Sequence, residues 1–199
     1  MRMTLATLAA AALLALTGCS NASTEAQEPT APTTAQATGA LADTDVLDTL
    51  GLQGKSGKEI VEALERTDAD RTAGIMGSVR ADEIVFSTPA GEQTVPLPED
   101  EFYVSIAPFV DQTHECFYHN LATCQGEIVG EDLAVTITTD DGQTLVDETV
   151  TTYDNGFVGF WLPRDIAGTI TVKLDGRTVE APIATGADDP TCVTTLQLT

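Results

Sequence analysis

A chain of 199 residues has room for one or two small domains, and 42% of its residues are hydrophobic, which is enough for an ordinary buried core. It carries 31 acidic against 9 basic residues, for a formal net charge of −22. A surface this acidic repels phosphate backbones and anionic lipid, which argues against nucleic acid as a partner.

The first residues have the pattern of a processing segment. Arg2 supplies a positive charge, residues 5–16 form an apolar stretch too short to span a bilayer, and Leu-Thr-Gly-Cys follows, ending at Cys19. This tetrapeptide resembles the lipobox of bacterial lipoproteins, which are cut before the cysteine and lipidated on it. We therefore expect residues 1–18 to be a lipoprotein signal peptide and Cys19 to carry lipid, so that the protein is extracytoplasmic and anchored to the bacterial cell membrane. An ordinary secreted protein is the alternative.

Residues 19–42 are predicted to form a flexible stalk after the lipidated cysteine. They are rich in Ala, Thr, Pro, Gln, Glu and Ser, which offer little surface to bury against the entropy cost of ordering.

The segment 43–98 is predicted to be a small α+β domain. A short helix at 45–50 should end at Gly51, and Ser56 three residues before Glu59 predicts a capping box for a second helix that ends near 68–70. Its apolar face comprises Ile60, Val61 and Leu64, with Lys58, Glu62 and Glu65 expected elsewhere on the helix. A strand over 78–87 and a returning strand over 93–97 then predict a hairpin.

The segment 99–199 is predicted to be a β-rich metal-binding domain. Asp-Gly and Asn-Gly turns separate its apolar, β-branched runs, which is typical of an antiparallel β-sandwich. The fold class is therefore α+β, a short helical and hairpin region followed by a sandwich-like domain. The expected strands are 102–110, 134–139, 144–152, 157–162, 169–174, 178–184 and 192–198.

One stretch stands apart in its chemistry. Both histidines of the protein, His114 and His119, lie within eleven residues together with Cys116 and Cys124. If Cys19 is lipidated, the only other cysteine is Cys192, which precedes the last predicted strand and could fold back onto this stretch.

Three cysteines are an odd number for an extracytoplasmic disulfide framework. Either one pair is oxidised, Cys116–Cys124 or Cys124–Cys192, with the histidines exposed on a loop, or all three thiols act together. Three thiolates suit Cu(I), since soft sulfur ligands favour soft cations, but Zn²⁺ also accepts sulfur and imidazole. The residue types alone therefore leave copper, zinc and a structural disulfide open.

The chain resembles the CueP family of copper-binding proteins of the bacterial cell envelope, most strongly after residue 100. The resemblance lies in Glu-Phe-Tyr-Val-Ser-Ile-Ala-Pro at 101–108, in the His-x-Cys-x2-His-x4-Cys-x-Gly-Glu pattern at 114–127, and in Asp-Asn-Gly-Phe-x-Gly-Phe-Trp-Leu-Pro-Arg at 154–164. It implies that Cys116, Cys124 and Cys192 bind the metal, with His114 and His119 as weaker contributors.

We therefore predict a copper-binding lipoprotein that sequesters or delivers copper, favoured as Cu(I) with zinc as the other candidate, and that catalyses no reaction. The expected partners are the membrane, through lipid at Cys19, an envelope protein that receives copper, and a second copy of the chain as a candidate. An envelope thiol–disulfide redox protein and a structural sandwich with a staple disulfide are the alternatives. Against the redox protein, the sequence has no Cys-x-x-Cys motif.

Overall fold

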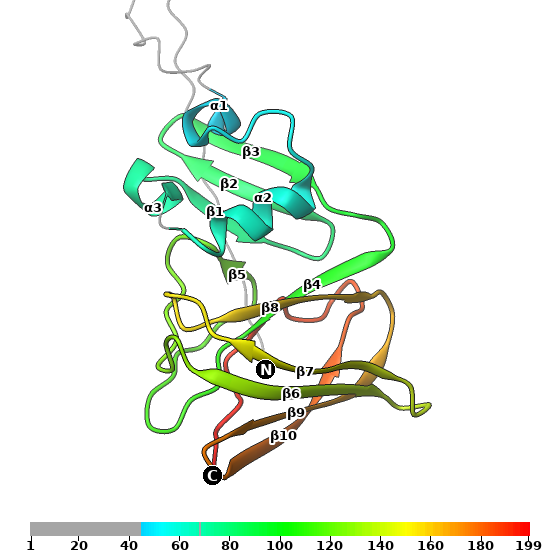
Figure 1. Ribbon diagram of the computed structural model, residues 1–199. Coiled ribbons are helices and arrows are strands. Elements are labelled where there is room, and N and C mark those ends of the chain that lie inside the picture. The colour runs from blue at the N-terminus through cyan, green and yellow to red at the C-terminus, as the bar shows by residue number, and fades with distance from the viewer. Residues whose placement is uncertain (1–44, 68) are drawn as a thin grey trace, which may run out of the picture. The chain divides into compact units, whose positions relative to one another are not determined.

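The computed structural model describes residues 45–67 and 69–199, which fall within one compact unit (Figure 1). The predicted signal peptide, Cys19 and the stalk lie outside the described residues. Within the described part of the chain, no helix has the length and apolar character needed to cross a membrane.

The helices lie at the start of the described chain. Helix α1, Val46–Leu50, is capped by Asp45, and α2, Gly57–Leu64, begins with the predicted capping box. The prediction that α2 reaches 68–70 is wrong, because the chain leaves the helix at Glu65 and then forms a separate short helix, α3, Ala69–Ala73.

These helices share an apolar core with a four-stranded antiparallel sheet in the order β3-β2-β1-β5.

The single strand predicted over 78–87 is in fact two strands. A turn at 80–82 separates them, closed by a hydrogen bond from the Arg80 amide to the Glu83 carbonyl, and it contains no glycine, proline or asparagine to mark it in the sequence. The strands are β1, Met76–Val79; β2, Glu83–Thr88; β3, Gly91–Pro96; and β5, His119–Asn120.

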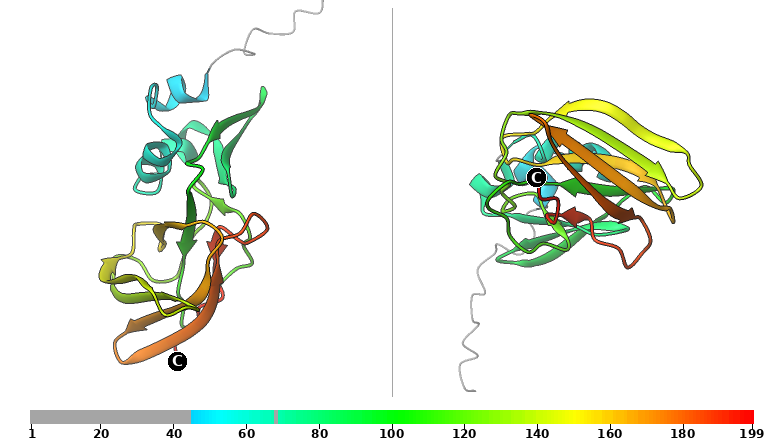
Figure 2. Two further views of the ribbon diagram at one scale, coloured as in Figure 1. Left: turned by 90° about the vertical axis from the view of Figure 1, so that its right-hand side faces the viewer. Right: turned by 90° about the horizontal axis from the view of Figure 1, so that it is seen from below.

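Two further sheets make up the rest of the molecule, in the orders β10-β9-β6-β7 and β11-β4-β8 (Figure 2). They enclose one large apolar core, and the predicted α+β class with an antiparallel sandwich-like part is confirmed. The final strand is shorter than predicted, and after residue 193 only a single bridge, Phe109 to Gln197, continues the pairing. The strands are β4, Glu101–Ile106; β6, Asp132–Thr139; β7, Thr144–Thr151; β8, Val158–Pro163; β9, Ala167–Leu174; β10, Arg177–Ala184; and β11, Cys192–Val193.

Strand β4 is buried on both faces and joins the two apolar cores. Phe102, Val104 and Ile106 enter the sandwich core, whereas Tyr103 packs with the helices and the first sheet. Its neighbour β11 runs parallel to it, with Cys192 opposite Ser105. The chain end is thereby brought beside the loop that follows β4. The predicted domain boundary at 98/99 falls between β3 and β4, and it stays a prediction.

Candidate metal centre

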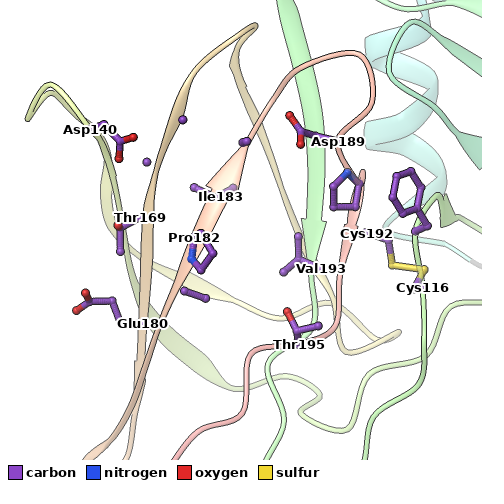
Figure 3. A pocket seen from close by; sticks show the side chains of 16 residues that line it. Cys116, Asp140, Thr169, Glu180, Pro182, Ile183, Asp189, Cys192, Val193 and Thr195 are labelled. Carbon is purple, nitrogen blue, oxygen red and sulfur yellow. A yellow bond between two sulfur atoms is a disulfide. The ribbon is translucent and has the colours of Figure 1, made fainter.

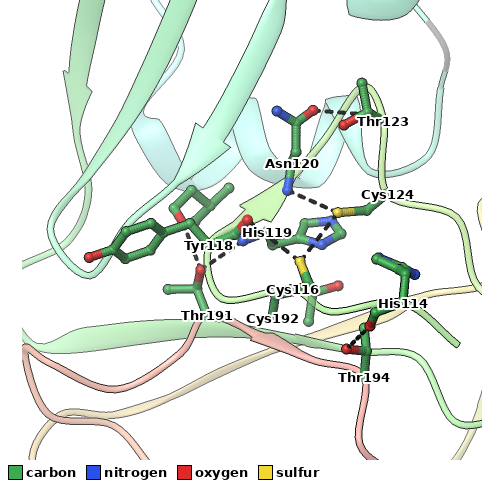
Figure 4. The surroundings of a disulfide bond; sticks show 12 residues. His114, Cys116, Tyr118, His119, Asn120, Thr123, Cys124, Thr191, Cys192 and Thr194 are labelled. Carbon is green, nitrogen blue, oxygen red and sulfur yellow. Dashed lines mark hydrogen bonds between the residues drawn. A yellow bond between two sulfur atoms is a disulfide. The ribbon is translucent and has the colours of Figure 1, made fainter.

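The three cysteines come from distant parts of the chain and meet at one place (Figure 4). Cys116 lies in the loop between β4 and β5, Cys124 follows β5, and Cys192 opens β11. Cys116 and Cys192 form a disulfide with their Cα atoms 5.6 Å apart, and Cys124 is a buried free thiol. The Cys124 sulfur lies 3.5 Å from that of Cys116.

This pairing differs from both disulfides considered at the sequence level, which were Cys116–Cys124 and Cys124–Cys192. The parallel alignment of β11 with β4 brings Cys192 to the loop, and the amide of Cys192 donates to the carbonyl of Phe117. The alternative of a structural disulfide placed both histidines exposed on a loop, whereas His119 has no solvent exposure.

Two threonines join the C-terminal segment to the cysteine loop. The Thr191 hydroxyl accepts from the His119 amide at 3.0 Å and donates to the Val79 carbonyl at 2.6 Å. The Thr194 hydroxyl donates to the His114 carbonyl at 2.6 Å. These bonds fix both histidine backbones relative to Cys192.

The turn after β5 directs Cys124 back toward the disulfide. The Asn120 side chain accepts from the amides of Ala122 and Thr123, at 3.1 and 3.0 Å, which is a local side-chain turn that asparagine favours. The Asn120 amide in turn lies 3.3 Å from the Cys124 sulfur and donates to it. Shortly afterwards the chain passes against the 154–156 turn at Gly126, where an added Cβ would overlap the Gly156 carbonyl.

His119 is paired with a buried carboxylate that the sequence did not single out. Its Nε2 lies 2.6 Å from Oε1 of Glu65, and both side chains are almost fully buried. Burial opposes the charge on Glu65, but the charge and hydrogen bonds around it hold its pKa below the ordinary value. Burial likewise opposes the charge on His119, yet Glu65 and the Cys124 sulfur raise the pKa of His119 to about 9. The expectation that Glu65 lies away from the apolar face of α2 is therefore wrong. Its place one turn after Val61 on that face is the signal that could have found it.

The described residues contain two groups of side chains that could hold a metal ion, and the groups share Cys124. One comprises His114, Cys116 and Cys124, and the other His119, Cys124 and Cys192; within each, the ligand atoms lie within 4.8 Å of one another. An ion bound at about 2.0–2.3 Å from each sulfur or nitrogen needs donor atoms roughly 3–4.6 Å apart, which is close to the spacing within each group. Each group includes one sulfur of the disulfide, which must be reduced before it can bind an ion. His114 lies nearer the solvent than His119.

Known proteins resemble this chain in sequence and in fold. The family model described as "Periplasmic copper-binding protein CueP" matches residues 59–197. The chain belongs to the CueP family. The crystal structure of S.CueP superimposes with a TM-score of 0.74 at 36% sequence identity, and the match covers 79% of this chain and 100% of that one. Among curated proteins, no significant match was found.

In this member of the CueP family, a pocket of about 680 Å³ adjoins the disulfide (Figure 3). Cys116, Cys192 and Phe117 line it on one side and residues of β9 and β10 on the other. Cys116 is itself partly exposed, so a small reductant in the solvent can reach the disulfide. Cys124 and His119 are buried and do not line this pocket.

Proposed function

We propose that this chain binds copper outside the cytoplasm as Cu(I), and that it sequesters the ion or delivers it to another envelope protein. Cys116, Cys124 and Cys192 supply the sulfur ligands, with His119 and His114 as weaker contributors. The observation that carries the proposal is the convergence of three sulfurs and a buried imidazole from distant segments, in a member of a copper-binding family. Soft thiolates favour Cu(I) over harder cations.

The oxidation state of the cysteines governs binding. Among residues 45–67 and 69–199, the disulfide form has a single free thiol, whereas reduction with two electrons and two protons gives three. A thiol must lose its proton before it can bind a metal, so loading releases protons. Protein purified in air therefore binds Cu(I) weakly, and reduction restores binding.

A thiol–disulfide redox protein is the second candidate, because the free Cys124 sulfur lies within 3.5 Å of the disulfide. A thiolate at this position could attack Cys116 and release Cys192. Such a protein would exchange disulfides with a peptide substrate in the absence of copper. A copper-binding protein needs no such activity.

Cu(I) titration without oxygen tests the proposal. The full chain carrying Cys19→Ala, which removes the fourth thiol, competes with a Cu(I) chelator before and after reduction by a phosphine. We expect the reduced protein to withdraw Cu(I) from the chelator and the oxidised protein to do so much less. Replacing any of Cys116, Cys124 or Cys192 by Ser weakens binding severely, because a hydroxyl is a hard ligand that seldom ionises.

Two outcomes contradict the proposal. If reduced protein fails to compete with a weak chelator, the copper assignment is wrong. If Zn²⁺ is held tightly while Cu(I) is not, the site is a zinc site, since sulfur and imidazole also suit zinc. The recipient of the copper and the pairing of two copies stay predictions.

A further inference from the structure

The carboxylate of Glu65 is satisfied on both oxygens without help from water. Oε1 accepts from the Tyr103 hydroxyl at 2.8 Å and the Ser105 hydroxyl at 3.2 Å, and it lies 2.6 Å from Nε2 of His119. Oε2 accepts from the side-chain amide of Asn155 at 3.1 Å. Glu65 is only 3% exposed, and a buried carboxylate is costly unless such partners surround it. Groups from α2, β4, β5 and the 154–156 turn thus meet on one side chain.

This contact fixes which nitrogen of His119 is left for other partners. Nε2 lies 2.6 Å from Oε1 of Glu65, although not in the geometry of a regular hydrogen bond, and the remaining nitrogen, Nδ1, is buried without a hydrogen-bond partner. The ring packs against Phe157 with centroids 4.7 Å apart, so it has little room to turn over. A ring nitrogen of His119 lies within 4.8 Å of the sulfurs of Cys124 and Cys192. An unpartnered buried nitrogen beside two sulfurs is what a metal ligand requires.

We propose that Glu65 is the positioning residue of the copper site, holding Nε2 of His119 so that Nδ1 is the atom presented to the ion beside Cys124 and Cys192. The inference rests on the proposed function, since it assumes that His119 binds the metal. A histidine ligand commonly donates its second N–H to a carboxylate, which fixes the tautomer and the ring orientation. Within residues 45–67 and 69–199, no ion pair joins the ring of His114 to a carboxylate. The two histidines therefore differ in role: a carboxylate orients the ring of His119, and none in the described part of the chain orients the ring of His114.

Glu65→Gln tests the proposal, because the amide keeps the size of the side chain but places an N–H₂ among groups that are all donors. We expect the reduced full chain carrying Cys19→Ala and Glu65→Gln to bind Cu(I) about 10- to 100-fold more weakly than the Cys19→Ala parent. Removing a carboxylate that holds a histidine ligand typically lowers metal affinity by this factor. Glu101→Gln is the matched control: it removes a carboxylate that pairs with Lys58 at 2.7 Å, away from the cysteines, and should leave the affinity unchanged.

A double-mutant cycle distinguishes positioning from general damage to the fold. In a His119→Ala background the imidazole that Glu65 orients is gone, so Glu65→Gln should have no further effect on Cu(I) affinity. Equal weakening by Glu65→Gln in both backgrounds would overturn the proposal. So would binding by Glu65→Gln within twofold of the parent.

Nitrogen NMR of the parent protein keeps the proposal testable if Glu65→Gln fails to fold. Long-range proton–nitrogen spectra of the reduced, Cu(I)-loaded protein should show Nε2 of His119 protonated and Nδ1 shifted by the metal. A metal-shifted Nε2, or a His119 ring that copper leaves unchanged, overturns the positioning role while leaving the proposed function intact. If the parent binds no Cu(I), the proposed function and this inference fall together.

Discussion

The disulfide should carry much of the stability of the oxidised protein. Cys116 and Cys192 are separated by 76 residues, so the bond closes a long loop in the unfolded chain. The chain-entropy relation for such a loop gives about 4.5 kcal/mol of stabilisation at 25 °C. Replacing both residues by Ser should remove that amount. The free energy of unfolding should fall by a further ~1 kcal/mol because a hydroxyl replaces the buried sulfur of Cys192. Both must be changed together, since Cys124 is close enough to pair with a single remaining partner.

Urea unfolding of the oxidised, copper-free chain measures this loss, with Cys124→Ser as the control that keeps the cross-link. The control should lose about 1 kcal/mol, the expected cost of a buried thiol-to-hydroxyl change. Reducing the disulfide of the parent should lower the free energy of unfolding by most of the same amount. Cu(I) at about 1,000 times its Kd should then raise the free energy of unfolding of the reduced protein by about 4 kcal/mol, because the ion binds only the folded state. If the Cys116→Ser/Cys192→Ser protein is as stable as the Cys124→Ser control, the disulfide is not a stabilising link and this reasoning is refuted.

Three other predictions concern the anchor, the buried ion pair and a close contact. Cys19→Ala should move the protein from the membrane to the soluble fraction on cell fractionation, and a variant that stays with the membrane would show the lipobox assignment to be wrong. The Glu65–His119 pair should stabilise the copper-free protein most between pH 4.5 and 6.5. Its contribution should be lost below pH 4.5 as Glu65 is protonated, and between pH 6.5 and about 9 as His119 loses its proton, because the pKa of His119 is raised. The loss on the alkaline side is at most about 3 kcal/mol, and a free energy of unfolding that is flat from pH 6 to 9.5 would contradict it. Gly159→Ala should lower the free energy of unfolding by about 2 kcal/mol, because a Cβ there overlaps the Tyr103 hydroxyl that donates to Glu65. A variant whose thermal unfolding matches that of the parent would contradict this prediction.

The sequence predicted local structure well where the signal is local. The capping box at Ser56 and Glu59 is present, and the Asp-Gly turn at 175–176 joins two paired strands. The turn at 80–82 was missed because its one turn-favouring residue, Asp82, is a weak signal by itself, and the pairing between β1 and β2 fixes where the turn lies. The residues of a strand do not show where it ends when its end is set by pairing with a neighbouring strand.

The site was predicted only in part for a similar reason. The residues of the 114–124 stretch were evident from their rarity in the chain, and the structure brings them together with Cys192. The pairing of Cys116 with Cys192, which are 76 residues apart, depends on the parallel register of β11 with β4, and the spacing of the cysteines does not encode that register. Glu65 was missed because an acidic residue near a helix end is ordinarily exposed, and only the tertiary contact with His119 explains its burial.

X-ray absorption at the copper edge of the reduced, Cu(I)-loaded chain carrying Cys19→Ala tests the central claim most directly. We expect one copper ion in the +1 state with a first shell dominated by sulfur and a minor contribution from imidazole, and the sulfur count should fall when Cys124 is replaced by Ser. A first shell of nitrogen and oxygen alone, or a sulfur shell unchanged by Cys124→Ser, would contradict it.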